Sequence, residues 1–213
     1  MATKPSDGEP GRGYHHGDLR RRLIEVGESL LEERGIEGFT LRECARRAGV
    51  SPSSPSHHFG NVTGLLTAIA TVGFDGLTEA QEASLVGLGD DPKARLKAIG
   101  GAYIRYAAAH PARFRVAFGN LPLEECDPQL KEAGARAMGV LKREVLAGRG
   151  GDAGTGFDIE VAYAWAAVHG FAGLFIDHHL FVVDSNRAPD AYLGEFADGF
   201  LALVVQALGY GSR

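Results

Sequence analysis

The stretch of sequence that decides the fold is residues 39–61, which read FTLRECARRAGVSPSSPSHHFGN. Thr40 and Glu43 have the spacing of a capping box, in which the threonine hydroxyl accepts the backbone N–H of Glu43 and the glutamate reaches back to Thr40. Phe39 and Cys44 stand at the positions of a hydrophobic staple, which holds the incoming chain against the first helical turns. These residues predict a short helix that begins immediately after Thr40.

The second half of this stretch predicts a tight turn and another short helix. Gly49 follows the first helix at a place where a residue in the left-handed conformation ends many helices. Ser51 and Pro52 are typical of an N-cap followed by proline at the first helical position, which predicts a helix over Pro52–His58. Two short helices joined by a glycine-containing turn form a helix-turn-helix motif, which we place at residues 40–59.

Helical spacing continues on both sides of this motif. After it, Asn61 can cap a helix that runs towards Leu85 and is long enough to connect two domains. No segment keeps the two-residue alternation of a strand, so the chain is predicted to be all-α. We expect an N-terminal three-helix domain with the helix-turn-helix, joined to a larger helical bundle. The helix before the motif is indicated by apolar residues three or four positions apart and ends at Gly35; these residues are Leu19, Leu23, Val26 and Leu30.

The last part of the chain predicts two long apolar helices, roughly Phe157–Phe181 and Pro189–Leu208. Each has more apolar surface than one face of a helix can bury in a small monomer. We therefore expect a homodimer through these two helices, with Leu201 and Val205 at its interface. Further helix starts and a glycine-rich loop are indicated by Asp91-Pro92, Asp127-Pro128 and Gly148–Gly156.

Composition excludes several classes of protein. With 45% hydrophobic and 23% charged residues, the chain of 213 residues is typical of a soluble globular protein. The polar N-terminus lacks the apolar core of a signal peptide. The most apolar run, Ala162–Leu180, contains Asp177 and three histidines, which argue against a membrane span. Cys44 and Cys126 cannot form a disulfide framework and are interpreted as small buried hydrophobic residues. A cytoplasmic protein without membrane association is predicted.

The net charge of −5 is unusual for a DNA-binding protein, but it is unevenly distributed. Residues 1–60 contain nine Lys/Arg and nine Asp/Glu, so the remaining residues carry the whole negative charge. A locally basic face on an acidic protein is compatible with contact to phosphates. The arginines of this first part form two clusters, which are Arg20, Arg21 and Arg22, and Arg42, Arg46 and Arg47.

The stretch from Tyr14 to Phe74 resembles the DNA-binding domain of the TetR/AcrR family of transcriptional regulators. In the C-terminal half, Trp165, His169 and Gly170 resemble the subgroup named for a Trp-His-Gly signature, and so does the segment 106–119. The resemblance implies a dimer that binds operator DNA and releases it when a small molecule occupies the C-terminal domain. The N-terminal match is carried by Tyr14–Arg20, Gly35–Arg42, Ala48–Ser51, His58-Phe59 and Leu65-Leu66. The domains expected are a disordered tail at 1–13, a TetR-type DNA-binding domain at 17–77, and a ligand-binding and dimerisation domain at 90–208.

The residues expected to contact operator DNA lie on the two helices of the motif. The second helix would enter the major groove, where short serine hydroxyls discriminate bases weakly. Specificity would then depend on Arg42, on Arg12 and Tyr14 of the N-terminal arm, or on DNA shape. The predicted contact residues are Thr40, Arg42, Ser51, Ser53, Ser54, Ser56, His57 and His58.

The second helix departs from the commonest family pattern. Pro55, Ser56 and His57 stand where that pattern has Leu, Tyr and a basic or polar residue, and Val62 replaces a Lys. These departures remove two expected phosphate contacts, which lowers the affinity expected for DNA. An alternative interpretation of Pro52–His58 is a solvated loop rich in serine and proline.

A second candidate site is an apolar pocket in the C-terminal domain. Aromatic and polarisable side chains with one or two polar atoms suit a small hydrophobic or aromatic effector, although the same residues could be ordinary core. No cofactor and no metal are expected. Adjacent helical residues point about 100° apart, so the pairs His57-His58 and His178-His179 do not make ligand sets. The predicted pocket residues are Tyr103, Phe114, Phe118, Met138, Trp165, His169 and Phe171.

These patterns favour a ligand-responsive DNA-binding repressor. The alternative is a small-molecule binding protein of the same fold whose DNA binding is weak or lost, which the departures at Ser56 and Val62 favour. An enzyme is disfavoured, because the sequence contains no nucleophile elbow, no H-E-x-x-H pattern and no Cys/His arrangement at usable spacing.

Overall fold

The computed structural model describes residues 16–148, 158–180, 188 and 191–209. Regular structure in this part of the chain is helical throughout, which confirms the predicted fold class. The predicted tail at 1–13, Arg12, Tyr14 and the glycine-rich loop after Gly148 lie outside the described residues. The elements are α1 (His16–Arg34), α2 (Leu41–Ala48), α3 (Ser54–Phe59), α4 (Val62–Leu85), α5 (Pro92–Ala109), α6 (Pro111–Phe118), α7 (Pro128–Gly148), α8 (Ile159–Ile176), a π-helical turn η1 (Tyr192–Phe196) and α11 (Ala197–Ala207).

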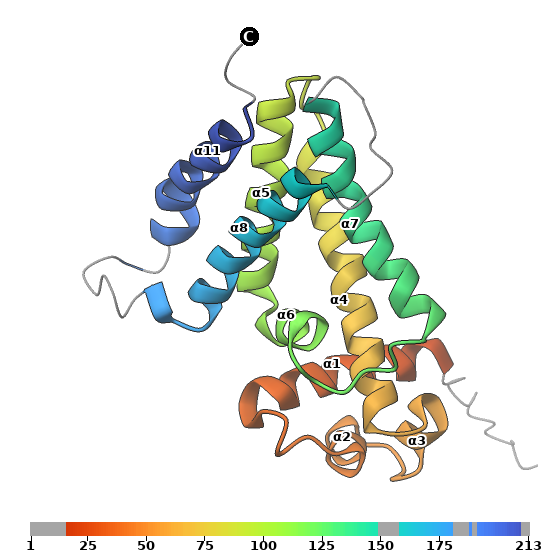
Figure 1. The fold of residues 1–213 in the computed structure, drawn as a ribbon. Helices are drawn as coiled ribbons and strands as arrows, with labels where there is room; N and C mark the ends of the chain where they lie inside the picture. The colour runs from red at the N-terminus through yellow and green to blue at the C-terminus, as the bar shows by residue number, and fades with distance from the viewer. Residues whose placement is uncertain (1–15, 149–157, 181–187, 189–190, 210–213) are drawn as a thin grey trace, which may run out of the picture.

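Two groups of helices are joined by one long helix. Figure 1 shows α1, α2 and α3 gathered as a small head at one end of α4, whose other end lies in a bundle with α5, α7 and α8. Helix α4 contacts α5, α6 and α7, and α11 packs against α5. The long helix after Asn61 therefore connects the head to the bundle, and the Asn61 side chain caps it by accepting the backbone N–H of Gly64 at 3.0 Å.

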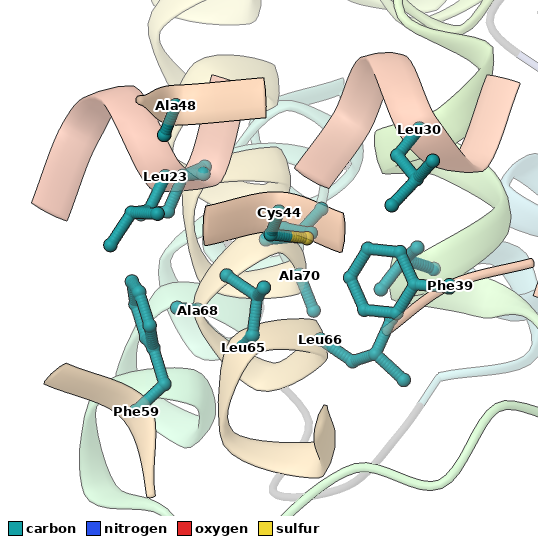
Figure 2. Close-up of a cluster of buried hydrophobic side chains, with 13 residues drawn as sticks. Leu23, Leu30, Phe39, Cys44, Ala48, Phe59, Leu65, Leu66, Ala68 and Ala70 are labelled. Atoms are coloured by element: carbon teal, nitrogen blue, oxygen red, sulfur yellow. The ribbon is translucent and has the colours of Figure 1, made fainter. Parts of the chain in front are cut away.

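The head has its own hydrophobic core, formed where α1, α2 and α3 meet the beginning of α4. Figure 2 shows Leu23 and Leu30 from α1, Cys44 from α2, Phe59 from α3, and Leu65 from α4 converging on one cluster. The predicted apolar face of α1 thus points inward. Burial raises the pKa of the Cys44 thiol to about 11, so this cysteine stays protonated and serves as a small hydrophobic side chain.

The helix-turn-helix has the caps predicted at Thr40 and Gly49, but Ser51 does not cap the second helix and the capping box is incomplete. Thr40 Oγ1 accepts the backbone N–H of Glu43 at 3.2 Å, and Gly49 ends α2 in the left-handed conformation at φ 69°. The Glu43 carboxylate does not complete the capping box, because it is bonded to arginines of the same helix. The second helix begins at Ser54 and not at Pro52, since Pro52 lies in a turn closed by Ser54 N–H donating to the Ser51 carbonyl.

The prediction for the last two helices was wrong in its boundaries. Helix α8 ends at Ile176, and the following helix is interrupted at Gly194, whose φ of −101° and ψ of −115° are not helical. Leu201 and Val205 are buried inside the protomer and line its interior. The large apolar residues that remain exposed on the described parts of these helices are Ile159, Tyr163, Leu174, Phe196 and Leu203.

Two further expectations concern the cysteine Cys126 and the apolar run that forms α8. Cys126 is exposed in the connection before α7, so its prediction as a buried residue was wrong. Helix α8 is, among the described helices, the one long and apolar enough to cross a membrane by length and composition alone. Its buried residues pack against α5 and α11, as those of a core helix do.

Candidate functional site

The first candidate site is the exposed surface of α2 and α3 at the end of the head. Arg42 is exposed in the first turn of α2, immediately after the cap Thr40. Within the described part of the chain, no carboxylate forms an ion pair with Arg42. Its guanidinium is therefore available to an external anion such as a DNA phosphate, or to a guanine edge in the major groove.

The other arginines of α2 are neutralised by carboxylates of the head. Arg46 donates to both carboxylate oxygens of Glu43 at 2.8 and 2.7 Å, and Arg47 bonds to Glu33 on α1 at 2.6 Å as well as to Glu43. The Arg46 hydrogen bonds, helped by those of Arg47, lower the pKa of Glu43 to about 2. This network ties α2 to α1, so within the described part of the chain Arg42 is the arginine of the predicted cluster that no carboxylate pairs.

The turn before α3 and α3 itself present a row of hydroxyls followed by one exposed imidazole. Ser51, Ser53, Ser56 and His57 are exposed, whereas Pro55 and Phe59 are buried and hold the helix on the head. Four serines are bonded to one another or to the backbone: Ser51 Oγ lies 3.1 Å from Ser53 Oγ and 2.9 Å from Ser54 Oγ, and Ser56 Oγ donates to the Ser53 carbonyl at 2.9 Å. Ser54 and His58 are only partly exposed.

The second candidate site is a cavity of about 420 Å³ inside the bundle. Its walls come from six helices between α4 and α11, and most of its lining is aliphatic or aromatic. The lining residues are Phe74, Leu77 and Gln81 of α4; Leu96, Ile99, Gly100 and Tyr103 of α5; Ala117 and Phe118 of α6; Gly134, Ala137, Met138 and Leu141 of α7; Ala164, Trp165 and Val168 of α8; and Leu201, Val204 and Val205 of α11.

The Trp-His-Gly segment forms a hydrogen-bonded relay at the wall of this cavity. The Tyr103 hydroxyl lies 2.8 Å from His169 Nδ1 and also forms a hydrogen bond with Trp165. Burial raises the pKa of Tyr103 and lowers the pKa of His169, so both groups stay neutral near pH 7. The indole N–H of Trp165 can only donate, so it donates to the Tyr103 oxygen, while the direction of the hydrogen bond between Tyr103 and His169 Nδ1 depends on the tautomer of the neutral imidazole.

Aromatic rings of α6 surround this relay. The Phe114 ring stacks on the His169 ring, with centroids 5.1 Å apart and an interplanar angle of 25°. The Phe118 ring contacts His169 with centroids 5.0 Å apart, and it packs at 5.2 Å against Phe74 of α4. Helix α6 is therefore fitted directly against the wall of the cavity.

The cavity contains some of the residues predicted for a pocket and not others. Tyr103, Phe118, Met138 and Trp165 line it, while Phe114 and His169 lie behind the lining and support it. Phe171 does not belong to it: its ring stacks on Phe200 with centroids 4.9 Å apart. The prediction missed the contributions of α4 and α11, including Gln81, since nothing in their local pattern says which face meets the cavity.

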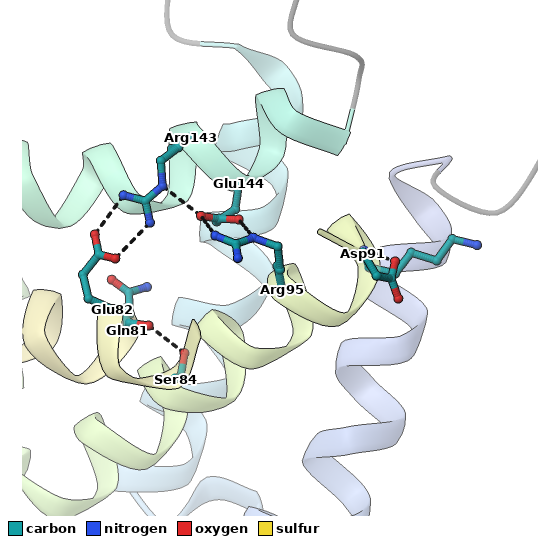
Figure 3. A network of polar contacts seen from close by, with 8 residues as sticks. Gln81, Glu82, Ser84, Asp91, Arg95, Arg143 and Glu144 are labelled. Atoms are coloured by element: carbon teal, nitrogen blue, oxygen red, sulfur yellow. Dashed lines mark hydrogen bonds and ion pairs between the residues drawn. The ribbon is translucent and has the colours of Figure 1, made fainter. Parts of the chain in front are cut away.

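A charged network lies beside one end of the cavity. Glu144 of α7 is 2% exposed and accepts two hydrogen bonds from Arg95 of α5, at 2.7 and 3.0 Å, and one from Arg143. Arg143 also reaches Glu82 of α4, so the network links three helices (Figure 3). Despite its burial, these arginines hold the pKa of Glu144 below its ordinary value, which keeps it ionised.

Two polar contacts connect the bundle with the head. Arg113 of α6 donates to both carboxylate oxygens of Glu28 on α1, at 2.6 and 3.1 Å, and the two side chains are 20% and 15% exposed. Thr67 on α4 accepts the backbone N–H of Glu124, in the connection between α6 and α7, at 2.9 Å. Helix α6 thus contacts the cavity relay through Phe114 and the head through Arg113.

No group of three or more His, Cys, Asp or Glu side chains suited to a metal occurs among the residues that the structure describes. His57 and His58 are neighbours on α3, with ring centroids 5.7 Å apart and nearly perpendicular planes. His178 and His179 follow α8 and are both exposed.

Comparison with known proteins yields two family matches and a set of similar sequences. Residues 23–69 match the model described as bacterial regulatory proteins, tetR family, and residues 96–200 match a Tetracyclin repressor-like C-terminal domain. The HTH-type transcriptional regulators BetI of Burkholderia cenocepacia and Burkholderia ambifaria are 35% and 36% identical over 80 residues. These alignments span 38% of this chain and 41% of the relatives' length.

Solved structures share the fold over most of the chain. A protein of unknown function from Rhodococcus sp. RHA1 is 35% identical, with a TM-score of 0.70 over 89% of this chain and 97% of that one. The FadR regulator of Bacillus subtilis, solved in complex with stearoyl-CoA, has a TM-score of 0.63 at 17% identity over 87% of this chain and 97% of its own. The likeness to FadR shows the fold alone.

Proposed function

Because this chain belongs to the TetR family of bacterial transcriptional regulators, we propose that it is a repressor that leaves its operator when a small apolar molecule enters the bundle cavity. The observation that carries the proposal is the cavity of about 420 Å³, whose wall is shared with a helix that is bonded to the DNA-binding head. Ligand cavities of this size and polarity are typical of sites for small molecules. We expect it to act in the cytoplasm, where bacterial operators are found.

For the DNA contact, we propose the exposed surface that begins with Thr40 and Arg42 and continues along α3. Arg42 would supply the strong charge-assisted contact, and the N-terminal turn of α2 would direct backbone N–H groups towards phosphate. Ser53, Ser56 and His57 would contribute weaker hydrogen bonds from α3. Arg12 and Tyr14 of the N-terminal arm stay candidates.

For the effector, we propose that binding is transmitted to the head by a shift in population between two arrangements of α6. A ligand that fills the cavity contacts Phe118 and the Tyr103 relay, and it favours the arrangement of α6 that best accommodates it. Arg113 would carry that preference to α1 through Glu28. In a dimer the two heads must match the spacing of two operator half-sites, so a small displacement of each head weakens DNA binding.

For assembly, we propose a homodimer formed by α8 and the exposed face of α11. Tyr163, Leu174, Phe196 and Leu203 are 45%, 46%, 40% and 65% exposed, and all lie on these last elements of the chain. Apolar side chains gathered on neighbouring helices are typical of a surface that a second copy covers.

The test is competition for the protein between a palindromic fragment from upstream of its own coding region and random DNA, at physiological salt. A specific regulator should prefer the palindromic fragment by at least about 10³-fold. If a folded dimer binds the palindromic fragment and random DNA with nearly equal affinity, the repressor function is contradicted.

One alternative function has an observation in its favour. A ligand-binding protein with weak DNA affinity would fit the Ser56 hydroxyl, which is bonded to the Ser53 carbonyl, and the apolar Val62 at the start of α4. If that alternative is right, a ligand should bind near Trp165, and the affinities for palindromic and random DNA should be nearly equal. The same competition experiment therefore separates the two functions.

A further inference from the structure

The cavity contains one polar group that its apolar lining does not explain, the side-chain amide of Gln81. Gln81 lies on α4, lines the cavity and is 4% exposed. Its Oε1 accepts no hydrogen bond from any described residue. In Figure 3 the amide leaves α4 on the side of α7, while the Gln81 backbone carbonyl accepts the Ser84 hydroxyl at 2.7 Å. A buried acceptor without a donor is unfavourable and is therefore rare in folded proteins.

The other polar side chains of the lining, among the described residues, are Tyr103 and Trp165, and both are already hydrogen-bonded. The Tyr103 hydroxyl is 2.8 Å from His169 Nδ1 and forms a hydrogen bond with Trp165, so this relay uses its own donors and acceptors. Aliphatic and aromatic carbon provides nearly all of the remaining lining. Gln81 Oε1 is therefore the acceptor that is left for a molecule inside the cavity.

The surroundings of Gln81 also bear on the charge of such a molecule. Among the described residues, no Asp, Glu, Lys, Arg or His lines the cavity. The nearby charges are bonded among themselves, since Glu144 accepts from Arg95 and Arg143, and Arg143 also pairs with Glu82. A charged group buried in the cavity would lose its hydration without gaining a counter-charge, which is strongly unfavourable.

We propose that the effector is an uncharged, largely apolar molecule with a hydrogen-bond donor, and that Gln81 Oε1 accepts this donor. An alcohol, a phenol or an N–H group on an aliphatic or aromatic body has this chemistry. The inference rests on the proposed function of the cavity as the effector site, and it adds the class of ligand and the residue that selects it. A carboxylate or ammonium ligand of the same length is rejected.

The test compares four probes of one chain length: 1-decanol, decyl methyl ether, decanoate and decylammonium. The alcohol can donate a hydrogen bond, the ether can only accept one, and the last two are charged at pH 7. Trp165 is the single tryptophan of the chain and lines the cavity, so its emission reports occupancy. Binding is measured on the full-length protein, on Gln81→Met, which keeps the length of the side chain, and on Gln129→Met, an exposed glutamine of α7 as the control.

For the unmodified protein and for Gln129→Met, decanol should bind roughly tenfold more tightly than the ether, since the net value of one buried hydrogen bond is of that order. Both charged probes should bind more weakly still. In Gln81→Met the preference for the alcohol should vanish, and the ether should bind at least as well as before. The melting temperature of ligand-free Gln81→Met should not fall, because the substitution removes an acceptor that has no partner.

The results that would contradict the role of Gln81 differ from those that would contradict the effector cavity. Equal binding of alcohol and ether to the unmodified protein, or an unchanged preference in Gln81→Met, overturns the role of Gln81 while leaving the effector cavity in place. A fall in the melting temperature of Gln81→Met by several degrees shows that its amide has a partner within the protein and also overturns the inference. If no probe shifts the Trp165 emission, both the ligand class and the effector cavity are contradicted, whereas the DNA competition still tests the head independently.

Discussion

At the scale of single residues, neighbouring arginines on one short helix have different roles because of the carboxylates near them. Arg46 and Arg47 are held by Glu43 and Glu33, which joins α2 to α1. Arg42 lies on the exposed side of the same helix, with no ion-pair partner in the described part of the chain. The network stabilises the head, and the residue outside it is the one we expect to contact DNA.

Replacement of Arg42 by alanine should therefore weaken operator binding without destabilising the head. If Arg42 contacts a phosphate, the slope of log K against log salt should become shallower by about one. If it contacts a base, the free-energy difference between the preferred base and the other bases at one operator position should decrease by ~1–3 kcal/mol. The control is Arg136→Ala, because Arg136 is a half-exposed arginine of α7 that pairs with Asp75, in the bundle and away from α2. Unchanged operator affinity in Arg42→Ala would remove Arg42 from the DNA contact.

A second residue-scale prediction concerns pH. Burial lowers the pKa of His169 from 6.5, so the unfolded chain takes up a proton at a pH where the folded protein does not. The free energy of unfolding should be at its full value above pH 6.5 and should decrease as the pH falls from 6.5 through the lower pKa of the folded state. Denaturant unfolding at pH 7.5, 6.5 and 5.5, followed by helical circular dichroism, measures this decrease.

The variant that isolates His169 is His169→Gln, which cannot titrate in this range but can still accept a hydrogen bond from Tyr103. It should lose less stability between pH 7.5 and 5.5 than the unmodified protein. His110 is the matched comparison, because burial lowers its pKa in the same direction, with Arg113 adding to the shift. Removing both histidines should flatten the pH dependence further. A pH profile of His169→Gln identical to that of the unmodified protein would contradict the neutral relay.

At the scale of elements, α11 has one face turned into the bundle and one face exposed to solvent. Leu201 and Val205 line the cavity and are 3% and 7% exposed, whereas Leu203 between them is 65% exposed. Because a helix turns by about 100° per residue, Leu203 lies on the side opposite to its two neighbours. One helix thus lines the cavity with one face and, in the dimer that we propose, offers its other face to a second protomer.

Leu203→Glu should lower the population of dimer without affecting the core of the protomer. A glutamate at the interface would be buried without a partner, at a cost of several kcal/mol. Sedimentation equilibrium should then give a mass close to the 22.6 kDa of one chain at micromolar concentration. Val86→Glu is the control, because Val86 is 82% exposed after the end of α4 and far from α11 in the sequence. A full dimer in Leu203→Glu would place the interface elsewhere.

At the scale of the whole molecule, α6 connects the two sites. Its Phe114 ring stacks on His169 at the cavity wall, and its Arg113 is bonded to Glu28 of the head, so one short helix contacts both. Coupling between ligand and DNA needs such an element with two arrangements of different affinity for each partner. The contacts of α6 suit it to that function.

We expect the double substitution Arg113→Met and Glu28→Met to uncouple the sites. Removing both charges avoids leaving one of them buried alone, which would destabilise the protein and obscure the result. The variant should still bind decanol, as reported by Trp165, and should still bind operator, but decanol should release less of the DNA. Arg136→Met with Asp75→Met removes an exposed pair between α4 and α7 and serves as the control. Undiminished release in the Arg113/Glu28 variant would exclude this pair from the transmission.

The features that the sequence by itself determined are local ones, namely helix caps and turns. The cap at Thr40, the left-handed Gly49 and the cap at Asn61 each depend on residues within about four positions, so their spacing was sufficient to predict them. The helix-turn-helix and the all-α class follow from these signals. The aromatic residues Tyr103, Phe118 and Trp165 also proved to line the cavity, because large apolar side chains on such helices are usually buried.

Only the tertiary structure decided which helix faces meet. Tyr103 and His169 are 66 positions apart, and Arg113 and Glu28 are 85 positions apart, so no local pattern relates them. For the same reason the buried Leu201 could not be told from an interface residue, and Gln81 could not be told from a solvated glutamine. Burial depends on the packing of distant helices, whereas caps and turns depend on backbone groups a few residues away. That difference in range explains why the motif could be predicted from spacing and the cavity could not.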